Sequence, residues 1–280
     1  GTKACVLASN YIVSVNIKTF EDNGIVFGFI NPVDLDFVSP DNRIFVVDKD
    51  DSKVKVVDLE SMEITSDIET GDSTKPIFIV SNSYKSFVLN GGGLSNQTKD
   101  STAIVIEYRD NLVALANFQG SLSVGDNPNS AVITSSGALK VLCKGVYDPE
   151  NPINNTESSL SHINQYSNEV YSTDNLSGIY NAQNLIGNYD NSYCYFTAVG
   201  GIYRLNPSNL NYNLIVSINA SVINTIVESF TVNDSTTMYY EMLYMNDTDS
   251  PNNIYKYNLA LSSFVDTIIF DGNVRDINFY

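Results

Sequence analysis

The hydrophobic residues of this chain come in short runs separated by polar turns. Residues 43–48 (RIFVVD) are rich in β-branched and aromatic residues, while residues 53–59 (KVKVVDL) and 63–69 (EITSDIE) alternate apolar with polar positions. Together with the preceding run at 33–41 (VDLDFVSPD), this pattern predicts four antiparallel strands joined as a meander. Because no long helical periodicity is evident, we expect an all-β protein.

The same unit recurs five more times, at intervals of about 40 to 60 residues that are typical of propeller blades. Each copy ends its third strand on Asp, Asn or Glu, and an Asx side chain there can bond the backbone two residues on and close the hairpin. The spacing predicts one β-propeller domain over residues 1–280 with six four-stranded blades. A seven-bladed ring, which would split the long fourth unit, is the alternative. The marker residues are Asn16, Asp58, Glu107, Asn164, Asn206 and Asn258.

The two ends of the sequence predict how the ring closes. The first unit starts with a second-strand sequence (ACVLAS), and the last residues (DGNVRDINFY) have the pattern of the missing inner strand. We expect Val274–Tyr280 to pair beside Ala4–Ser9, because an open array of blades would leave exposed sheet edges.

Three polar insertions occur at equivalent places, between the second and third strands of a unit. They are rich in Gly, Asn, Pro or Ser, so they are predicted to be loops that project from the same face of the propeller. Loops placed in this way often carry function. The insertions cover residues 90–101, 145–158 and 246–253.

Composition narrows the classes of partner. The formal net charge is −17, with 32 acidic and 15 basic residues, and such an acidic surface disfavours binding to nucleic acid. No run of about 18 apolar residues is present, so no membrane span is expected. The three Cys fit no zinc or disulfide spacing and are interpreted as small buried hydrophobic residues.

The sequence offers no recognisable catalytic set. Its single His, His162, has no Cys or second His placed to join it in a transition-metal site, and no Ser/His/Asp arrangement or phosphate-binding loop is present. The acidic turn at 48–52 (DKDDS) supplies oxygens that suit Ca²⁺ but lacks the twelve-residue loop of known calcium motifs. We therefore expect no catalytic residues, no metal site and no cofactor, with Ca²⁺ as the one alternative.

Acidic residues near the central channel are the remaining candidates for a ligand site. Asp34 and Asp36 alternate on the predicted inner strand of the second unit, and Asp276 lies beside Arg275 in the last segment. Asp72 and Asp126 precede the inner strands of the third and fourth units. These six residues are the predicted channel site, although inner-strand acids also commonly bind water or neighbouring backbone.

Several segments resemble the YVTN/YncE-like β-propeller family. They are the Gly…Pro entry at 125–134 (GDNPNSAVIT), the strand at 44–51 (IFVVDKDD) and the strand with its turn at 54–64 (VKVVDLESMEI). The resemblance is clearest in units two to four. Members usually have seven blades, and the YVTN tetrapeptide is absent here, with Phe45–Asp48 as its nearest counterpart. The resemblance implies an exported or surface-attached bacterial protein, often a lipoprotein, without established catalysis.

Together these observations predict a non-catalytic binding module that presents one propeller face to a protein or glycan partner. The family resemblance places it outside the cytoplasm, in the periplasm or at the cell surface, with a lipid anchor on a leader as one arrangement, and we expect a monomer. One alternative is a Ca²⁺-dependent enzyme of the lactonase or lyase kind, with the channel acids as ligands. The other is a structural component of a surface layer.

Overall fold

The computed structural model describes residues 3–38, 42–71, 74–92, 99–108, 117–134, 136–233 and 236–278, and the regular secondary structure of these residues is almost entirely β-strand. The one helical element among them is a short 3-10 turn, η2 (Pro152–Asn154). The first blade contains β1 (Lys3–Leu7), β2 (Tyr11–Asn16) and β3 (Asp22–Phe27), and the second contains β4 (Pro32–Val38), β5 (Arg43–Asp48), β6 (Lys53–Asp58) and β7 (Glu63–Glu69). The third contains β8 (Pro76–Ser81), β9 (Lys85–Asn90), β10 (Thr102–Glu107) and β11 (Asn117–Ser123), and the fourth contains β12 (Pro128–Ile133), β13 (Ala138–Cys143), β14 (Ser159–Asn164) and β15 (Glu169–Asn175). The fifth contains β16 (Gln183–Gly187), β17 (Cys194–Ala198), β18 (Gly201–Leu205) and β19 (Tyr212–Val216), and the sixth contains β20 (Ile223–Asn233), β21 (Thr236–Asp247), β22 (Ser250–Asn258) and β23 (Ser263–Ile269).

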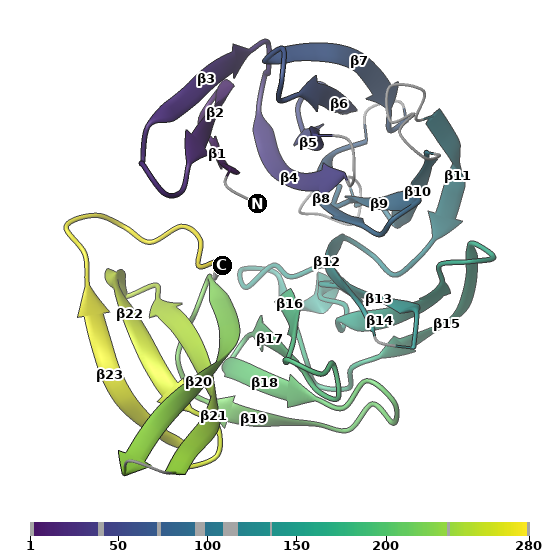
Figure 1. The fold of residues 1–280 in the computed structure, drawn as a ribbon. Helices are drawn as coiled ribbons and strands as arrows, with labels where there is room; N and C mark the ends of the chain where they lie inside the picture. Colours follow the sequence, from purple (N-terminus) through teal and green to yellow (C-terminus); the bar gives the residue numbers. More distant parts are fainter. Residues whose placement is uncertain are drawn as a thin grey trace.

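Six antiparallel sheets follow one another around a ring, so the predicted six-bladed β-propeller is confirmed (Figure 1). Strands run from the axis outward in chain order within each blade. The seven-bladed alternative is wrong, because the long fourth unit forms one four-stranded sheet, β12 to β15.

The Asx turns that marked the repeat are present at the outer hairpins. Asn16 Oδ1 accepts the N–H of Lys18 at 2.9 Å, and Asp58 Oδ1 accepts that of Glu60 at 2.8 Å. Asn164 and Asn206 make the same bond to the residue two positions on, and Asn258 bonds Leu261 three positions on. The sequence marker therefore has a direct structural cause.

The hydrophobic core is divided into five clusters, one between each pair of consecutive blades from the first to the sixth. The cluster between the second and third blades, for example, joins Phe45 and Val56 to Val88 and Ile104. Cys143 and Cys194 are buried in such clusters and Cys5 is half-buried, all as free thiols. Among the described residues no cluster joins the sixth blade to the first.

Ring closure is where the structure differs from the sequence prediction. The first blade has three strands, and among the described residues β1 pairs with β2 alone. The segment that follows β23 crosses toward the axis (Figure 1), and its residues up to Asn278 form no ladder with β1. The backbone of this segment forms hydrogen bonds with the sixth blade instead. The N–H of Val274 donates to Pro251 O at 2.7 Å, and Ile277 O accepts from Asn224 Nδ2 at 2.6 Å.

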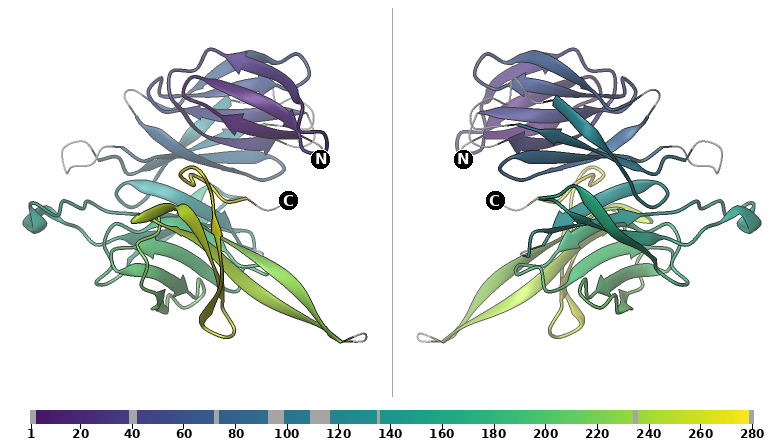
Figure 2. Two further views of the ribbon diagram at one scale, coloured as in Figure 1. Left: turned by 90° about the vertical axis from the view of Figure 1, so that its left-hand side faces the viewer. Right: turned by 90° about the vertical axis from the view of Figure 1, so that its right-hand side faces the viewer.

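The two faces of the propeller carry different connections. We call the "loop face" the side formed by the turns between second and third strands and by the connections from one blade to the next. Residues 145–158 project from this side, whereas the far ends of β20 and β21 extend from the opposite side (Figure 2). This topology is consistent with the prediction that the insertions share a face, although residues 93–98 of the first lie outside the described residues. The prediction of a loop at 246–253 is wrong, because β21 runs to Asp247 and β22 starts at Ser250, so a two-residue turn joins them.

Candidate functional site

The loop face of the second blade has a depression of about 400 Å³. It lies where the β5–β6 turn meets the connection from β7 to β8. Apart from Gly71, every side chain that lines it is polar or charged, so it suits a ligand with several hydrogen-bonding groups. The lining residues are Lys49, Asp50, Asp51, Ser52, Glu69, Gly71, Thr74 and Lys75.

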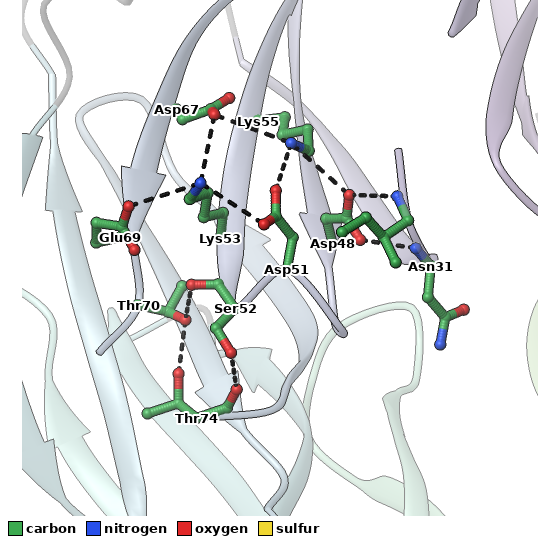
Figure 3. A network of polar contacts seen from close by, with 11 residues as sticks. Asn31, Asp48, Asp51, Ser52, Lys53, Lys55, Asp67, Glu69, Thr70 and Thr74 are labelled. Atoms are coloured by element: carbon green, nitrogen blue, oxygen red, sulfur yellow. Dashed lines mark hydrogen bonds and ion pairs between the residues drawn. The ribbon is translucent and has the colours of Figure 1, made fainter. Parts of the chain in front are cut away.

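A buried ion-pair network lies beneath this depression (Figure 3). Lys55, whose side chain is only 7% exposed, lies 2.6 Å from Asp51 and 3.8 Å from the fully buried Asp48. The two carboxylate oxygens of Asp48 accept the N–H groups of Ile30 and Asn31, both at 2.8 Å. Asp48 thereby fixes the entry to β4, while Lys55 fixes the β5–β6 turn above it.

The rim of the depression is tied together in the same way. Lys53 lies within 3.8 Å of carboxylates of Asp51, Asp67 and Glu69. Thr70 Oγ1 donates to Ser52 O at 2.7 Å, and Ser52 Oγ donates to Thr74 O. These contacts connect the β5–β6 turn to the β7–β8 connection, so the two sides of the depression are held in fixed positions.

Electrostatics keep these groups charged at neutral pH. The hydrogen bond from Lys55 holds the pKa of Asp51 below its usual value, and the Asp51 charge raises the pKa of Lys53. The depression therefore presents fixed carboxylates and ammonium groups side by side.

The predicted channel residues divide between two places. Asp34 and Asp36 lie on β4, the innermost strand of the second blade, and the charge of Asp276 is felt at Asp34. Asp34 accepts the N–H of Leu35 at 2.9 Å and that of Ile79, in the third blade, at 2.8 Å. Asp36 accepts the N–H of Ser81 at 2.7 Å. Both side chains thus join adjacent inner strands.

Burial raises the pKa of Asp34 to about 7, against the lowering effect of its two backbone hydrogen bonds, and the charges of Asp36 and Asp276 raise it further. Asp276 is exposed and accepts the N–H of Ile277 at 2.8 Å, while Arg275 beside it is also exposed. The structure therefore brings Asp34, Asp36 and Asp276 to the axis, chiefly in contact with backbone.

The remaining two predicted residues do not join them. Asp126 lies on the loop face in the connection from β11 to β12, where it forms an ion pair with Lys99 at 2.5 Å. Asp72 lies outside the described residues. The predicted site of six residues is thus not assembled as one constellation among the residues that are described.

The single His and the acidic turn at 48–52 each lie against lysine side chains. In the described ranges no three His, Cys, Asp or Glu side chains converge in a way that could hold a metal ion. His162 lies against Lys140 and 3.4 Å from Asp174, and its pKa is lowered by burial and then by the Lys140 charge. The acidic turn at 48–52 has its charges compensated by Lys53 and Lys55.

Sequence reasoning found this turn as an acidic cluster but missed the lysines that complete it. The signal was available, because Lys53 and Lys55 are two residues apart on a strand and so point to the same face. Which carboxylates they meet depends on the neighbouring strand β7 and on the register that pairs Lys53 with Glu69 and Lys55 with Asp67.

Comparison with known proteins supports the fold. The sequence matches no protein-family model and no curated protein. Among solved structures it is similar to the β-propeller domain of Cps50 (Swd1) from Myceliophteria thermophila, with a TM-score of 0.65, 10% identity, and coverage of 97% of this chain and 84% of that one.

Two further neighbours are longer proteins. Hydrazine synthase from Kuenenia stuttgartiensis gives a TM-score of 0.60 at 15% identity over 98% of this chain and 66% of that one. Dihydro-heme d1 dehydrogenase NirN, in complex with DHE, gives a TM-score of 0.61 at 13% identity, and the match covers 97% of this chain and 54% of that one. At these identities the likeness shows the propeller fold alone. In the part of the chain that is described, no helix is long and apolar enough to cross a membrane.

Proposed function

We propose that this protein is a non-catalytic interaction module that binds a protein or glycan partner through the loop face of its second to fourth blades. The observation that carries the proposal is the polar depression of about 400 Å³ between the β5–β6 turn and the β7–β8 connection. Its carboxylates, ammonium groups and hydroxyls are fixed by the ion-pair network beneath it, so a ligand would meet a preorganised surface.

The setting of this activity is part of the proposal. Segments that resemble the YVTN/YncE-like family support an exported or surface-attached protein outside the cytoplasm. The acidic net charge of −17 is consistent with a partner other than nucleic acid.

A matched pair of charge reversals tests which face binds. Asp50 lies in the β5–β6 turn at the depression, and Glu60 lies in the β6–β7 turn at the other end of the same blade; both are exposed. On glycan and peptide arrays, Asp50→Lys should abolish the binding of the unmodified protein, whereas Glu60→Lys should leave it intact. Binding that survives Asp50→Lys but is lost with Glu60→Lys, or no binding to any array member, would overturn the proposal.

A catalytic function is the second candidate, and the raised pKa of Asp34 is the observation that favours it. A carboxyl that titrates near neutrality is suited to general acid–base work. In its calcium-dependent form this hypothesis predicts that sub-millimolar Ca²⁺ raises the melting temperature relative to EDTA-treated protein, because binding to the native state stabilises it by mass action. An unchanged melting temperature would contradict it.

Self-association, as in a surface layer, is the third candidate. All seven residues of β23 are exposed, and four of them are large apolar residues, including Phe264 and Ile269. Exposed apolar residues gathered on one outer strand are typical of an interaction surface. Sedimentation equilibrium at increasing concentration separates a monomer, which the interaction module predicts, from the oligomers that a surface layer requires.

A further inference from the structure

A row of three polar side chains crosses the fourth blade. Lys140 on β13, His162 on β14 and Ser172 on β15 lie directly opposite one another in the ladders of this sheet. Two residues along the same strands, Leu142 and Leu160 belong to the hydrophobic cluster between the fourth and fifth blades. Because residues two apart on a strand point to the same face, the polar row also faces the fifth blade and adjoins this cluster.

The side chains of this row are linked by direct contacts. Lys140 Nζ donates to Nδ1 of His162, and Nε2 of His162 lies 3.4 Å from Oδ2 of Asp174 on β15. The same Asp174 oxygen accepts Ser172 Oγ at 2.8 Å. Because an ammonium group can only donate, the neutral imidazole accepts at Nδ1 and carries its proton on Nε2, toward Asp174. An amine, a base and a carboxylate that orients the base thus stand in line, which is the arrangement of an activated nucleophile.

The surroundings of Lys140 favour its neutral form. Burial lowers the pKa of Lys140, against the opposing effects of Cys194 and Asp174. Burial also raises the pKa of Cys194 to about 11, so this thiol carries no charge at neutral pH. Within the described residues Lys140 forms no ion pair with a carboxylate. A lysine in such a place supplies free amine, the form that attacks carbonyl groups.

The line of contacts runs from the seam between the blades out to solvent. The Asp174 side chain is 41% exposed and that of His162 is 13% exposed, while Lys140 is half-buried. The amine is therefore neither sealed in the core nor free in solvent, which favours small carbonyl compounds over bulky ones.

We propose that Lys140 is a covalent attachment site for small aldehydes, which it holds as a Schiff base formed with the help of His162. His162 Nδ1 takes a proton from the Lys140 ammonium, and the amine nitrogen adds to the carbonyl carbon to give a carbinolamine. The imidazolium then returns the proton to the carbinolamine hydroxyl, which leaves as water. The sum converts ammonium and aldehyde into protonated imine and water with no redox change. This site is separate from the loop face, so the inference does not rest on the proposed function.

Reductive trapping with acetaldehyde and cyanoborohydride, read by peptide mass spectrometry, compares two lysines of the unmodified protein. Cyanoborohydride serves only to convert the imine into a stable secondary amine. At pH 7 and limiting reagent, Lys140 should be ethylated about a hundredfold faster than Lys18, an exposed lysine in the β2–β3 turn, since a positioned base contributes about this much. Modification of Lys140 no faster than that of Lys18 would overturn the inference.

Two further measurements test the base and the size of the aldehyde. His162→Asn retains an amide near the position of Nδ1 but cannot take up the proton, so ethylation of Lys140 should fall to the rate of Lys18, which itself stays unchanged. A melting curve establishes that the variant is folded, and unchanged reactivity of Lys140 in it would rule out His162 as the base. With the bulkier pyridoxal 5′-phosphate, Lys18 should be labelled ahead of Lys140; the reverse order would contradict the restriction to small aldehydes.

Discussion

Single polar side chains on the inner strands connect one blade to the next. Asp34 bonds the backbone of Ile79 in the third blade, Ser130 Oγ accepts the N–H of Leu185 in the fifth, and Asn224 donates to Ile277 O. The axis is thus held together by side chain to backbone hydrogen bonds, and the identity of each side chain decides how it responds to pH.

The titration of Asp34 gives the first prediction. Its folded-state pKa of about 7 lies above the usual value of about 3.9, so the folded protein holds this proton more tightly than the unfolded chain does. The stabilising effect of this proton should therefore be fully present below about pH 4 and be lost as the pH rises to about 7, with no further pH dependence from Asp34 outside that range. Carboxyl carbon NMR should give a midpoint near 7, and a midpoint near 4 would contradict the account.

Asp34→Asn is the matching variant. At the related position in β20, Asn224 Oδ1 accepts the N–H of Thr225 at 2.8 Å, as Asp34 Oδ1 accepts that of Leu35. We expect the asparagine to keep this bond and to remove the Asp34 part of the pH dependence from melting curves recorded between pH 5 and 8.

The Asx turns give a second prediction at this scale. Asn206 Oδ1 accepts the N–H of Ser208 at 2.9 Å and closes the hairpin between β18 and β19. Asn206→Ala should lower the free energy of unfolding by about 1 kcal/mol, the net value of one such hydrogen bond. Asn206→Asp retains the acceptor and should remain near the stability of the unmodified protein in urea titrations; a loss equal to that of the alanine variant would argue against the turn.

At the scale of elements, the second blade owes its shape to the buried ion pairs under the loop face. Removing one member leaves the others as uncompensated buried charges, so Lys55→Ala should destabilise the protein by about 3 to 5 kcal/mol. The double variant Asp48→Asn/Lys55→Met removes charge from both sides and should recover part of that loss. Chemical denaturation of the three proteins measures both effects, and a double variant less stable than Lys55→Ala would contradict the network.

The strands themselves were predictable from sequence, because each depends on neighbouring residues. Strands β6 and β7 were predicted from the alternation of apolar and polar residues in KVKVVDL and EITSDIE. The repeat was predicted from the Asx residues that follow the third strands, such as Asp58 and Asn164. The depression was not predictable, because it depends on which carboxylates of β7 and of the β5–β6 turn meet Lys53 and Lys55 across the sheet.

At the scale of the whole molecule, the sequence predicted the number of blades but not how the last segment is held. The backbone N–H and C=O groups of Val274 and Ile277 could have formed hydrogen bonds with β1 or with the sixth blade. The alternation of apolar residues in this segment suits either partner. Asn224 and Pro251 supply the actual partners, and these lie more than twenty residues away in the chain.

Deletion of residues 274–280 tests the part this segment plays. Ile277 is 7% exposed, and its segment runs between the first and sixth blades, where no hydrophobic cluster was found in the described residues. We expect the truncated protein to melt several degrees lower, because it loses this burial and the bonds to the sixth blade. An unchanged melting temperature in scanning calorimetry would show that the segment does not stabilise the ring.

The central claim is that the loop face, rather than the acidic axis, is the binding surface. The most direct measurement is a TROSY NMR titration of deuterated protein with the array member that binds the unmodified protein most tightly. The account predicts shifts that concentrate at Lys49, Ser52, Thr74 and Lys75. Shifts concentrated at Asp34 and Asp276, with the loop face unchanged, would contradict it and would place the ligand at the axis.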